Sequence, residues 1–171
     1  GAEVTLVSGP VQIASPLCVR LIPVVTAADM ASAVKECYKE QDIIIKTAAV
    51  ADYRPAHPAD EKVKKKDAES VLELERTEDI LAYLGAHRRD GQFICGFSME
   101  TENMLENSRA KLARKNVDMI VANNLKTEGA GFGVDTNVVT ILTPEETKEL
   151  PLMEKAQVAR VLLDEIRARR S

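Results

Sequence analysis

The sequence predicts an α/β fold with three layers and a mainly parallel sheet. Short β-branched runs such as "DIIIKTAAV" alternate with segments of helical periodicity along the whole chain. The 171 residues suffice for one domain with a sizeable core. Hydrophobic residues make up 45% of the chain and charged residues 29%, which is the balance of a globular protein.

The N-terminal part is expected to contain three strands and a helix. "VTLVSG" at 4–9 has the pattern of a buried strand, and "VRLIPVV" at 19–25 of a second strand, confined to a sheet edge by its proline. A helix is predicted over 26–41, with Thr26 as its N-cap. "DIIIKTAAV" at 42–50 is typical of a central parallel strand.

A long polar segment at 53–70 follows and is expected to form a flexible functional loop. "VLELE" at 71–75 alternates like a half-exposed strand. Thr77 is predicted to cap the next helix, whose first turn would carry Glu78 and Asp79. The remaining predictions are strands at 93–99, 117–124 and 138–142, and helices at 100–116 and 154–170.

Polar segments follow several of the predicted strands. In open α/β sheets, ligands bind outside the carboxyl ends of the strands. The segments after Val50, Met99 and Asn124 are therefore expected to gather on one rim of the sheet. Residues 1–171 would then form a single Rossmann-like domain with its site at that rim.

Composition argues against several classes of function. A net charge of -4 disfavours broad nucleic-acid binding, and no apolar run approaches the roughly 20 residues of a membrane span. The N-terminus lacks the basic leader of a signal peptide. Cys18, Cys37 and Cys95 form no CxxC pair, so no zinc site is expected. Free thiols favour the cytoplasm, and Cys95 is interpreted as a small core residue.

The stretch "AAVADYRP" is the first candidate site. Small residues at the end of a strand, among them Ala48 and Ala49, allow close approach to the backbone. Asp52 then offers a carboxylate and Tyr53 a hydroxyl group. A strand that simply ends in a polar turn would show the same pattern, so both interpretations stay open.

The stretch "DEKVKKK" holds Lys62, Lys64, Lys65 and Lys66. Lysine binds phosphate as a point charge on a flexible stem, so such a loop suits a phosphoryl or nucleotidyl intermediate. Spacing alone favours the simpler alternative, a solvated run of charge.

Lys111 and Lys115 lie four residues apart and would share a helix face with Met104 and Ser108. Two ammonium groups at the margin of a buried stripe, which Leu105 and Leu112 would form, could clamp a triphosphate. They could equally complement the C-terminal end of the helix dipole.

The stretch "GAGFGVD" at 129–135 is a weak signal for a tight turn. It has neither the GK[ST] of a Walker A loop nor the spacing of a GxGxxG fingerprint. No chemical role follows from these residues alone.

Six motifs occur in order: "AAVADYRP", "EKVKKK", "RTEDIL", "GFSMETEN", "RAKLARKNVDMIVANN" and "GFGVDTN". Together they resemble bacterial phosphopantothenoylcysteine synthetase, the ligase domain of the bifunctional coenzyme A biosynthesis flavoprotein. The resemblance runs from "VTLVSGP" to the final helix. No motif is decisive alone, but six in order with matched spacing are specific.

The resemblance implies a CTP-dependent carbon–nitrogen ligase that joins 4'-phosphopantothenate to L-cysteine in coenzyme A biosynthesis. The substrate carboxylate would attack CTP in the presence of Mg²⁺, giving an acyl-cytidylate and pyrophosphate. The cysteine amine would then displace CMP. The resemblance also implies a homodimer, which in the family is often fused to a flavin-dependent decarboxylase, with no FMN in this domain.

The resemblance assigns site residues as well. The nucleotide would be surrounded by Ala48, Ala49, Asp52, Lys62, Thr77, Glu78, Asp79, Ile80, Phe97, Lys111 and Lys115. Lys62 is expected to act in the second half-reaction, on a flexible loop near the dimer partner, with Lys64 to Lys66 as supporting charge. Backbone groups near Ala48 and Asp52 would read the pyrimidine edge. Whether Phe97 stacks on the base or lines its pocket stays open, as do the Mg²⁺ ligands.

The chain departs from the family at its start. Family members begin with an additional strand, a glycine-rich turn and a helix with an "SNxSSG"-like motif, whereas this chain opens at "GAEVTL". We therefore expect residues 1–171 to be a piece of a longer protein that binds CTP poorly by itself. Intact mass would test this against 18.8 kDa.

Two other functions compete with the ligase. A nicotinamide-dependent oxidoreductase would suit the strand–helix pattern, but no GxGxxG fingerprint is present. A non-catalytic dimerisation fragment of the ligase is the second. Responses to CTP and NADPH would distinguish the three.

Overall fold

The computed structural model describes residues 1–59, 61, 71–100, 102–124, 127, 129–131 and 133–170. The chain forms two compact units. Unit 1 consists of Gly1–Glu36 and Ala49–Ile80, and unit 2 of Cys37–Ala48 and Leu81–Ser171. The single domain expected over residues 1–171 stays a prediction.

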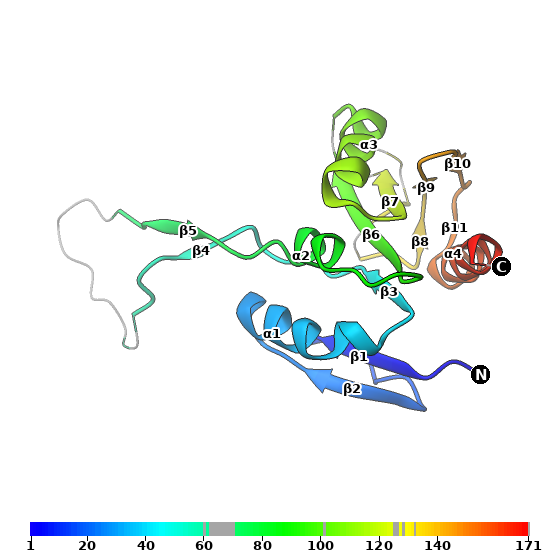
Figure 1. Cartoon of the computed structure of the whole chain (residues 1–171). Coiled ribbons are helices and arrows are strands. Elements are labelled where there is room, and N and C mark those ends of the chain that lie inside the picture. Colours follow the sequence, from blue (N-terminus) through cyan, green and yellow to red (C-terminus); the bar gives the residue numbers. More distant parts are fainter. Residues whose placement is uncertain are drawn as a thin grey trace. The chain divides into compact units, whose positions relative to one another are not determined.

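Unit 1 begins with two parallel strands and a helix (Figure 1). Strand β1 (Val4–Ser8) pairs with β2 (Val19–Pro23), and helix α1 (Ala27–Cys37) follows. Thr26 caps α1 as predicted, because its hydroxyl accepts the Asp29 N–H at 3.1 Å. The Asp29 carboxylate returns the interaction by accepting the Thr26 N–H at 2.8 Å.

A second strand pair in unit 1 was only partly expected. Strand β4 (Tyr53–Pro55) pairs antiparallel with β5 (Leu74–Arg76), so the segment predicted as a loop over 53–70 begins with a short strand. Residue 60 and residues 62–70 lie outside the described residues. The expected flexibility of this loop therefore stays a prediction.

The sheet of unit 2 has the strand order β10-β9-β7-β6-β3. Strands β3 (Ile43–Lys46), β6 (Phe93–Glu100) and β7 (Met119–Asn124) are parallel. Strands β9 (Val139–Leu142) and β10 (Thr147–Glu149) continue the sheet in antiparallel pairs. The predicted α/β class with a mostly parallel central sheet is confirmed.

Short elements complete unit 2. Tyr38–Glu40 form a 3₁₀ turn, η1, before β3. Strands β8 (Thr136–Asn137) and β11 (Met153–Glu154) make a small antiparallel pair. Because Met153 pairs with Asn137, helix α4 (Lys155–Arg169) starts close to Asn137.

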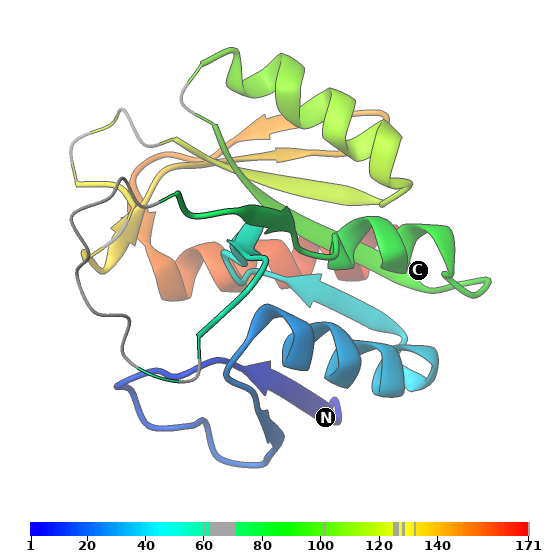
Figure 2. The same cartoon turned by 90° about the vertical axis from the view of Figure 1, so that its left-hand side faces the viewer.

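Helices cover both faces of this sheet, which makes three layers. Helices α2 (Ile80–Ala86) and α3 (Met104–Lys115) lie on one face and α4 on the other (Figure 1). Figure 2 shows α3 lying along β6 and β7. Successive side chains of a strand point to opposite faces. The main core therefore joins alternate residues of the strands to α4: Phe93, Cys95, Met119, Val121, Val139, Ile141, Leu150, Val158, Leu162 and Ile166.

On the other face, close packing requires glycine at two positions. A Cβ atom on Gly96 would lie 2.5 Å from the Leu81 side chain. A Cβ atom on Gly85 would lie only 1.7 Å from the Lys115 carbonyl oxygen. Since that second neighbour is backbone, α2 and the end of α3 can approach this closely only because Gly85 has no side chain.

Two details of the predicted helices were wrong. Thr77 does not cap a helix, because its hydroxyl donates instead to the Ala51 carbonyl oxygen at 2.5 Å and α2 begins at Ile80. The buried stripe of α3 is Ser108 and Leu112, whereas Leu105 is 38% exposed. Ser108 is buried because its hydroxyl lies 2.7 Å from that of Ser98 on β6.

Cys95 is fully buried in the core, as predicted. Burial, with a smaller contribution from the charge of Asp118, raises the pKa of its thiol to about 12. Among the described residues, no helix combines the length and apolar character needed to cross a membrane.

Candidate functional site

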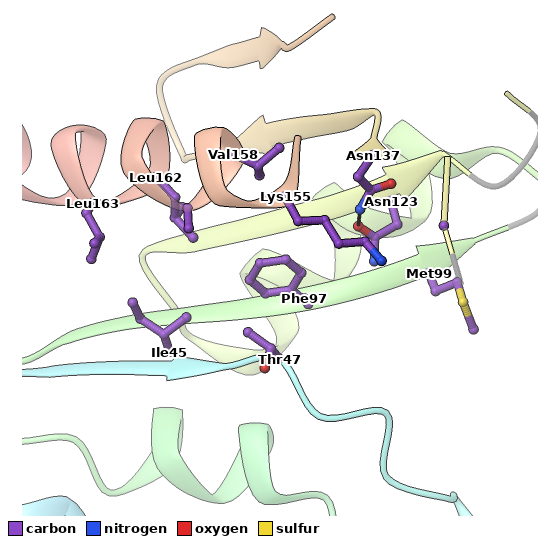
Figure 3. A pocket seen from close by; sticks show the side chains of 12 residues that line it. Ile45, Thr47, Phe97, Met99, Asn123, Asn137, Lys155, Val158, Leu162 and Leu163 are labelled. Carbon is purple, nitrogen blue, oxygen red and sulfur yellow. Dashed lines mark hydrogen bonds between the residues drawn. The ribbon is translucent and has the colours of Figure 1, made fainter. Parts of the chain in front are cut away.

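A pocket of about 490 Å³ lies within unit 2, on the face of the sheet that α4 covers (Figure 3). Thr47, Met99 and Asn123 line it, and each stands at or just beyond the carboxyl end of β3, β6 or β7. Parallel strands present these ends at one edge, which is where ligands bind in open α/β sheets. These three strand ends of unit 2 therefore lie at one edge of the sheet, and the expected gathering of the segments after Val50, Met99 and Asn124 stays a prediction.

The walls of the pocket are mostly apolar. Phe97 lies between β6 and the side chains of α4, and Ile45 lies beside it on β3 (Figure 3). Helix α4 contributes Val158, Leu162 and Leu163. A largely apolar cavity with a few polar groups is the usual form of a small-molecule site, and an aromatic ring on its wall can pack against a planar ligand.

Two asparagines supply the polar edge of the pocket. The Asn137 side-chain amide donates to Oδ1 of Asn123 at 3.0 Å. Oδ1 of Asn137 in turn accepts the backbone N–H of Val138 at 3.0 Å. Because Asn123 near the end of β7 pairs with Val139 at the start of β9, this antiparallel pairing brings the amides of Asn123 and Asn137 together.

Lys155 is the cationic group of the pocket. It is the first residue of α4, its backbone N–H donates to the Asp135 carbonyl oxygen at 2.8 Å, and its side chain extends into the pocket (Figure 3). No described residue makes a hydrogen bond or ion pair with its ammonium group. Three donors are therefore available to an anionic or acceptor-rich ligand.

Lys111 lies on the other face of the sheet. Its ammonium group is 3.3 Å from Glu100, the last residue of β6, and both side chains are about one-quarter exposed. Glu100 and Phe97 have opposite parity on β6, so they point to opposite faces. The end of β6 thus separates the apolar pocket from this Lys111–Glu100 pair.

Lys115 lies at the far end of α3. Its carbonyl oxygen packs against Gly85, and the next residue, Asn116, donates from its side chain to the Gly85 carbonyl oxygen at 2.8 Å. This backbone lies beside the end of α2, whereas Lys111 reaches the end of β6. The shared helix face alone therefore does not bring both lysines to one strand end, and a role for Lys115 stays a prediction.

Unit 1 brings two of the predicted residues together. The Thr77 backbone N–H donates to the Asp52 carbonyl oxygen at 3.0 Å, because the register of β4 on β5 places Tyr53 opposite Arg76. The carboxylate of Asp52 is exposed next to this link. Ala49, also in unit 1, is exposed.

The following predicted residues have different surroundings. Glu78 forms an ion pair with Lys35 of α1 at 2.6 Å. Asp79 is exposed, whereas the side chain of Ile80 is 4% exposed and therefore presents only its backbone to a ligand. The Ala48 carbonyl oxygen, in unit 2, accepts the Lys46 ammonium group at 3.0 Å.

The predicted catalytic residue, Lys62, lies outside the described residues, as do Lys64, Lys65 and Lys66. The pocket also contains residues that the sequence did not single out, namely Thr47, Asn123, Asn137 and Lys155. Paired asparagines at a strand end were a usable signal for Asn123. Lys155 had none, because only the fold places the start of α4 at this edge.

The chain matches a family model described as "DNA/pantothenate metabolism flavoprotein C-terminal domain" over residues 1–169. The chain belongs to this family. It is 49% identical over 170 residues to the "Coenzyme A biosynthesis bifunctional protein CoaBC" of Bacillus subtilis (strain 168), covering 98% of this chain and 42% of that protein. The chain thus spans less than half the length of this curated relative.

The chain is also similar to two other proteins, one solved structure and one curated sequence. A solved structure, the crystal structure of the C-terminal domain of CoaBC, has a TM-score of 0.80 and 45% identity, covering 98% of this chain and 76% of that chain. A "Cysteine/Cysteine sulfinic acid decarboxylase" of an unknown prokaryotic organism is 44% identical, covering 97% of this chain and 47% of that protein. Since the match takes in less than half of that protein, its decarboxylase activity is not transferred to this chain.

Proposed function

We propose that this chain provides the ligase part of a coenzyme A biosynthesis enzyme. It would join 4'-phosphopantothenate to L-cysteine, with CTP as the activating nucleotide, to give 4'-phosphopantothenoylcysteine. The observation that carries the proposal is the 49% identity to CoaBC of Bacillus subtilis over 98% of this chain. The pocket at the strand ends of unit 2 supports it, because ligands of such sheets bind there.

The reaction has two steps. In the first, a carboxylate oxygen of phosphopantothenate attacks the α-phosphorus of CTP, and pyrophosphate leaves with the electron pair of the broken bond. In the second, the cysteine amine attacks the acyl carbon of the acyl-cytidylate, CMP leaves, and the amine loses a proton. The first step brings one anion to another, so its rate depends on cations that neutralise the phosphates.

The geometry of unit 2 supports a nucleotide that lies across the end of β6, with its base on one face of the sheet and its phosphates on the other. The apolar pocket beside Phe97 suits the flat, weakly polar base, with the ring lining the pocket wall. Lys111 on the opposite face suits the phosphates, because its partner among the described residues is the single carboxylate of Glu100. A phosphate could displace or bridge that contact.

Mg²⁺ would be bound chiefly through the phosphates of the nucleotide. Proteins hold Mg²⁺ with one or two carboxylates plus substrate phosphates rather than with a dedicated cage. Glu100 at the end of β6 would be a carboxylate within reach of such an ion. When bound, the ion would neutralise phosphate charge and help pyrophosphate to leave.

Lys62 is proposed to act in the second step by approaching the acyl-cytidylate and stabilising the leaving phosphate of CMP. Lys64, Lys65 and Lys66 would add positive charge. On this proposal, Lys62→Gln leaves CTP binding largely intact and slows product formation. Joint loss of CTP affinity and acyl-cytidylate formation would instead place Lys62 among the groups that bind CTP itself.

The enzyme is further proposed to be a cytoplasmic homodimer whose loop at 53–70 lies near the partner. This rests on the family resemblance and on the free thiols of the chain. Light scattering of the natural protein would measure the dimer directly.

Pyrophosphate release is the test of the proposed function. The full-length natural protein is expected to release pyrophosphate only when CTP, Mg²⁺ and 4'-phosphopantothenate are all present, and CMP once L-cysteine is added. Lys111→Ala should weaken CTP binding about tenfold or more, since it removes a charged hydrogen-bond donor.

Arg114→Ala is the matched control, because Arg114 is an exposed cation on the same helix. It should leave CTP affinity unchanged. Stabilisation by NADPH without any response to CTP would favour an oxidoreductase, and no response to any nucleotide would favour a non-catalytic fragment.

A further inference from the structure

The "GFGVDTN" stretch has no role in the reaction described above, yet its end is fixed at the pocket. The Thr136 hydroxyl donates to the Gly129 carbonyl oxygen at 2.5 Å, and the Asp135 carbonyl oxygen accepts the Lys155 N–H at 2.8 Å. The last residue, Asn137, lines the pocket. This stretch therefore positions two polar residues of the pocket, Lys155 at the start of α4 and Asn137.

The hydrogen bonds of Asn137 determine the orientation of its amide. A backbone N–H can only donate, so the Asn137 atom that meets the Val138 N–H must be the oxygen. The NH₂ group is then the end that meets Asn123. Because that group can only donate, the Asn123 atom facing it must be Oδ1. The orientation of one amide thus dictates that of the other.

The consequence is that Asn123 presents a donor to the pocket. Its oxygen is used by Asn137, and no described residue accepts a hydrogen bond from its NH₂ group. Every buried side-chain nitrogen or oxygen among the described residues has a hydrogen-bond partner, so this NH₂ group is not sealed in the interior. Asn123 lines the pocket, and its NH₂ group is therefore open to a ligand there (Figure 3).

We propose that Asn137 is a positioning residue that, by holding the Asn123 amide with its NH₂ group toward the pocket, favours cytosine over uracil. The proposal rests on the proposed function, in which CTP is the nucleotide. Cytosine and uracil differ at C4, which carries an amino group in cytosine and a carbonyl oxygen in uracil, and at ring atom N3, where the proposal places the Asn123 NH₂ group. N3 is a bare acceptor in cytosine and an N–H donor in uracil. A fixed donor attracts the first and leaves the second facing another donor.

Asn137→Asp tests this coupling. One carboxylate oxygen still accepts the Val138 N–H, but the other can no longer donate. Asn123 must then turn its NH₂ group toward Asp, which exposes its oxygen to the pocket. CTP binding to the full-length natural protein is expected to weaken about tenfold, while UTP binding is unchanged or tighter, as measured by titration calorimetry with Mg²⁺.

Asn123→Asp is the second variant, because it keeps the bond from Asn137 and presents a carboxylate oxygen to the pocket. It should shift the ratio of CTP to UTP affinity in the same direction, even if Asn137→Asp fails to fold. Thr136→Val is the control. It removes the hydrogen bond from Thr136 of this stretch to Gly129 without touching the amide pair, and should leave the ratio unchanged.

The outcomes separate the two proposals. If the natural protein does not bind CTP, the proposed function fails. If it binds CTP but does not prefer it to UTP, or if both asparagine variants keep the original preference, the role of Asn137 is overturned. Equal weakening of CTP and UTP in both variants would likewise show that Asn137 only maintains the local structure.

Discussion

Burial decides which side chains of unit 2 can react. The Cys95 thiol has no exposed surface, and its pKa is raised to about 12, so it stays protonated at neutral pH. Cys18 is exposed and Cys37 is half-buried. The three cysteines of the chain therefore differ in accessibility. A cysteine reacts with an electrophile only when its thiol is ionised and exposed to the reagent.

Alkylation is expected to follow this order. With iodoacetamide at pH 8, the folded protein should be modified at Cys18 and not at Cys95, as shown by peptide mass spectrometry. In denaturant, Cys95 should react as well, which serves as the control for the reagent. Modification of Cys95 in the folded protein at the rate of Cys18 would contradict its burial.

At the scale of elements, an ion-pair cluster holds α4 to the edge of the sheet. Lys148 on β10 lies 2.5 Å from Glu165 on α4, and Arg169 pairs with both Glu165 and Glu146. The hydrogen bond from Lys148, followed by that from Arg169, lowers the pKa of Glu165 below its ordinary value. The folded state therefore favours the ionised carboxylate more than the unfolded state does.

Glu165→Gln should lower stability in a pH-dependent way. Because the folded pKa is lowered, the contribution of Glu165 is full above its unfolded pKa and is lost as pH falls through the folded value. Urea unfolding should show a loss of about 1 kcal/mol at pH 7 that shrinks as the pH falls below the ordinary pKa of glutamate. Asp164→Asn, which alters a more exposed carboxylate of the same helix, should change little at either pH. A deficit that does not vary with pH would contradict this account.

Periodicity predicted the long elements and missed the short ones. Strands β6, β7 and β9 and helices α1 and α4 were expected from apolar patterns near their observed places. Strands β4, β8, β10 and β11 have only two or three residues each, too few for a periodic pattern, and they are defined by pairing with another strand. No local pattern identifies such strands.

The site was predictable where it follows from strand ends. The residues at the end of β6 and the rim itself followed from the rule that ligands bind at carboxyl ends. Asn137 and Lys155 did not. Antiparallel β9 starts at this edge directly after Asn137, and β10 runs back before the β8–β11 pair places the start of α4 there. Ser108 was placed on the wrong stripe of α3, since its buried hydroxyl is compensated by Ser98, a partner ten residues away.

At the scale of the whole molecule, the chain is divided between two units that each draw on separate parts of the sequence. Unit 2 is interrupted between Ala48 and Leu81 by a segment that belongs to unit 1. Its strand β3 thus comes from before the interruption, while β6, β7, β9 and β10 come from after it. This sheet cannot be completed by neighbouring residues alone.

That arrangement has a consequence for the order of folding. Strand β6 pairs with β7 across one helix, from Cys95 to Met119, whereas β3 pairs with β6 across twice that distance, from Ile43 to Phe93. Closing a longer loop costs more chain entropy, and distant contacts slow folding. Pulse-labelling hydrogen exchange during refolding should therefore find the amides of β7 protected before those of β3. Protection of β3 before β7 would contradict this order. In the expected order, β6 and β7 pair first and β3 joins the sheet after them.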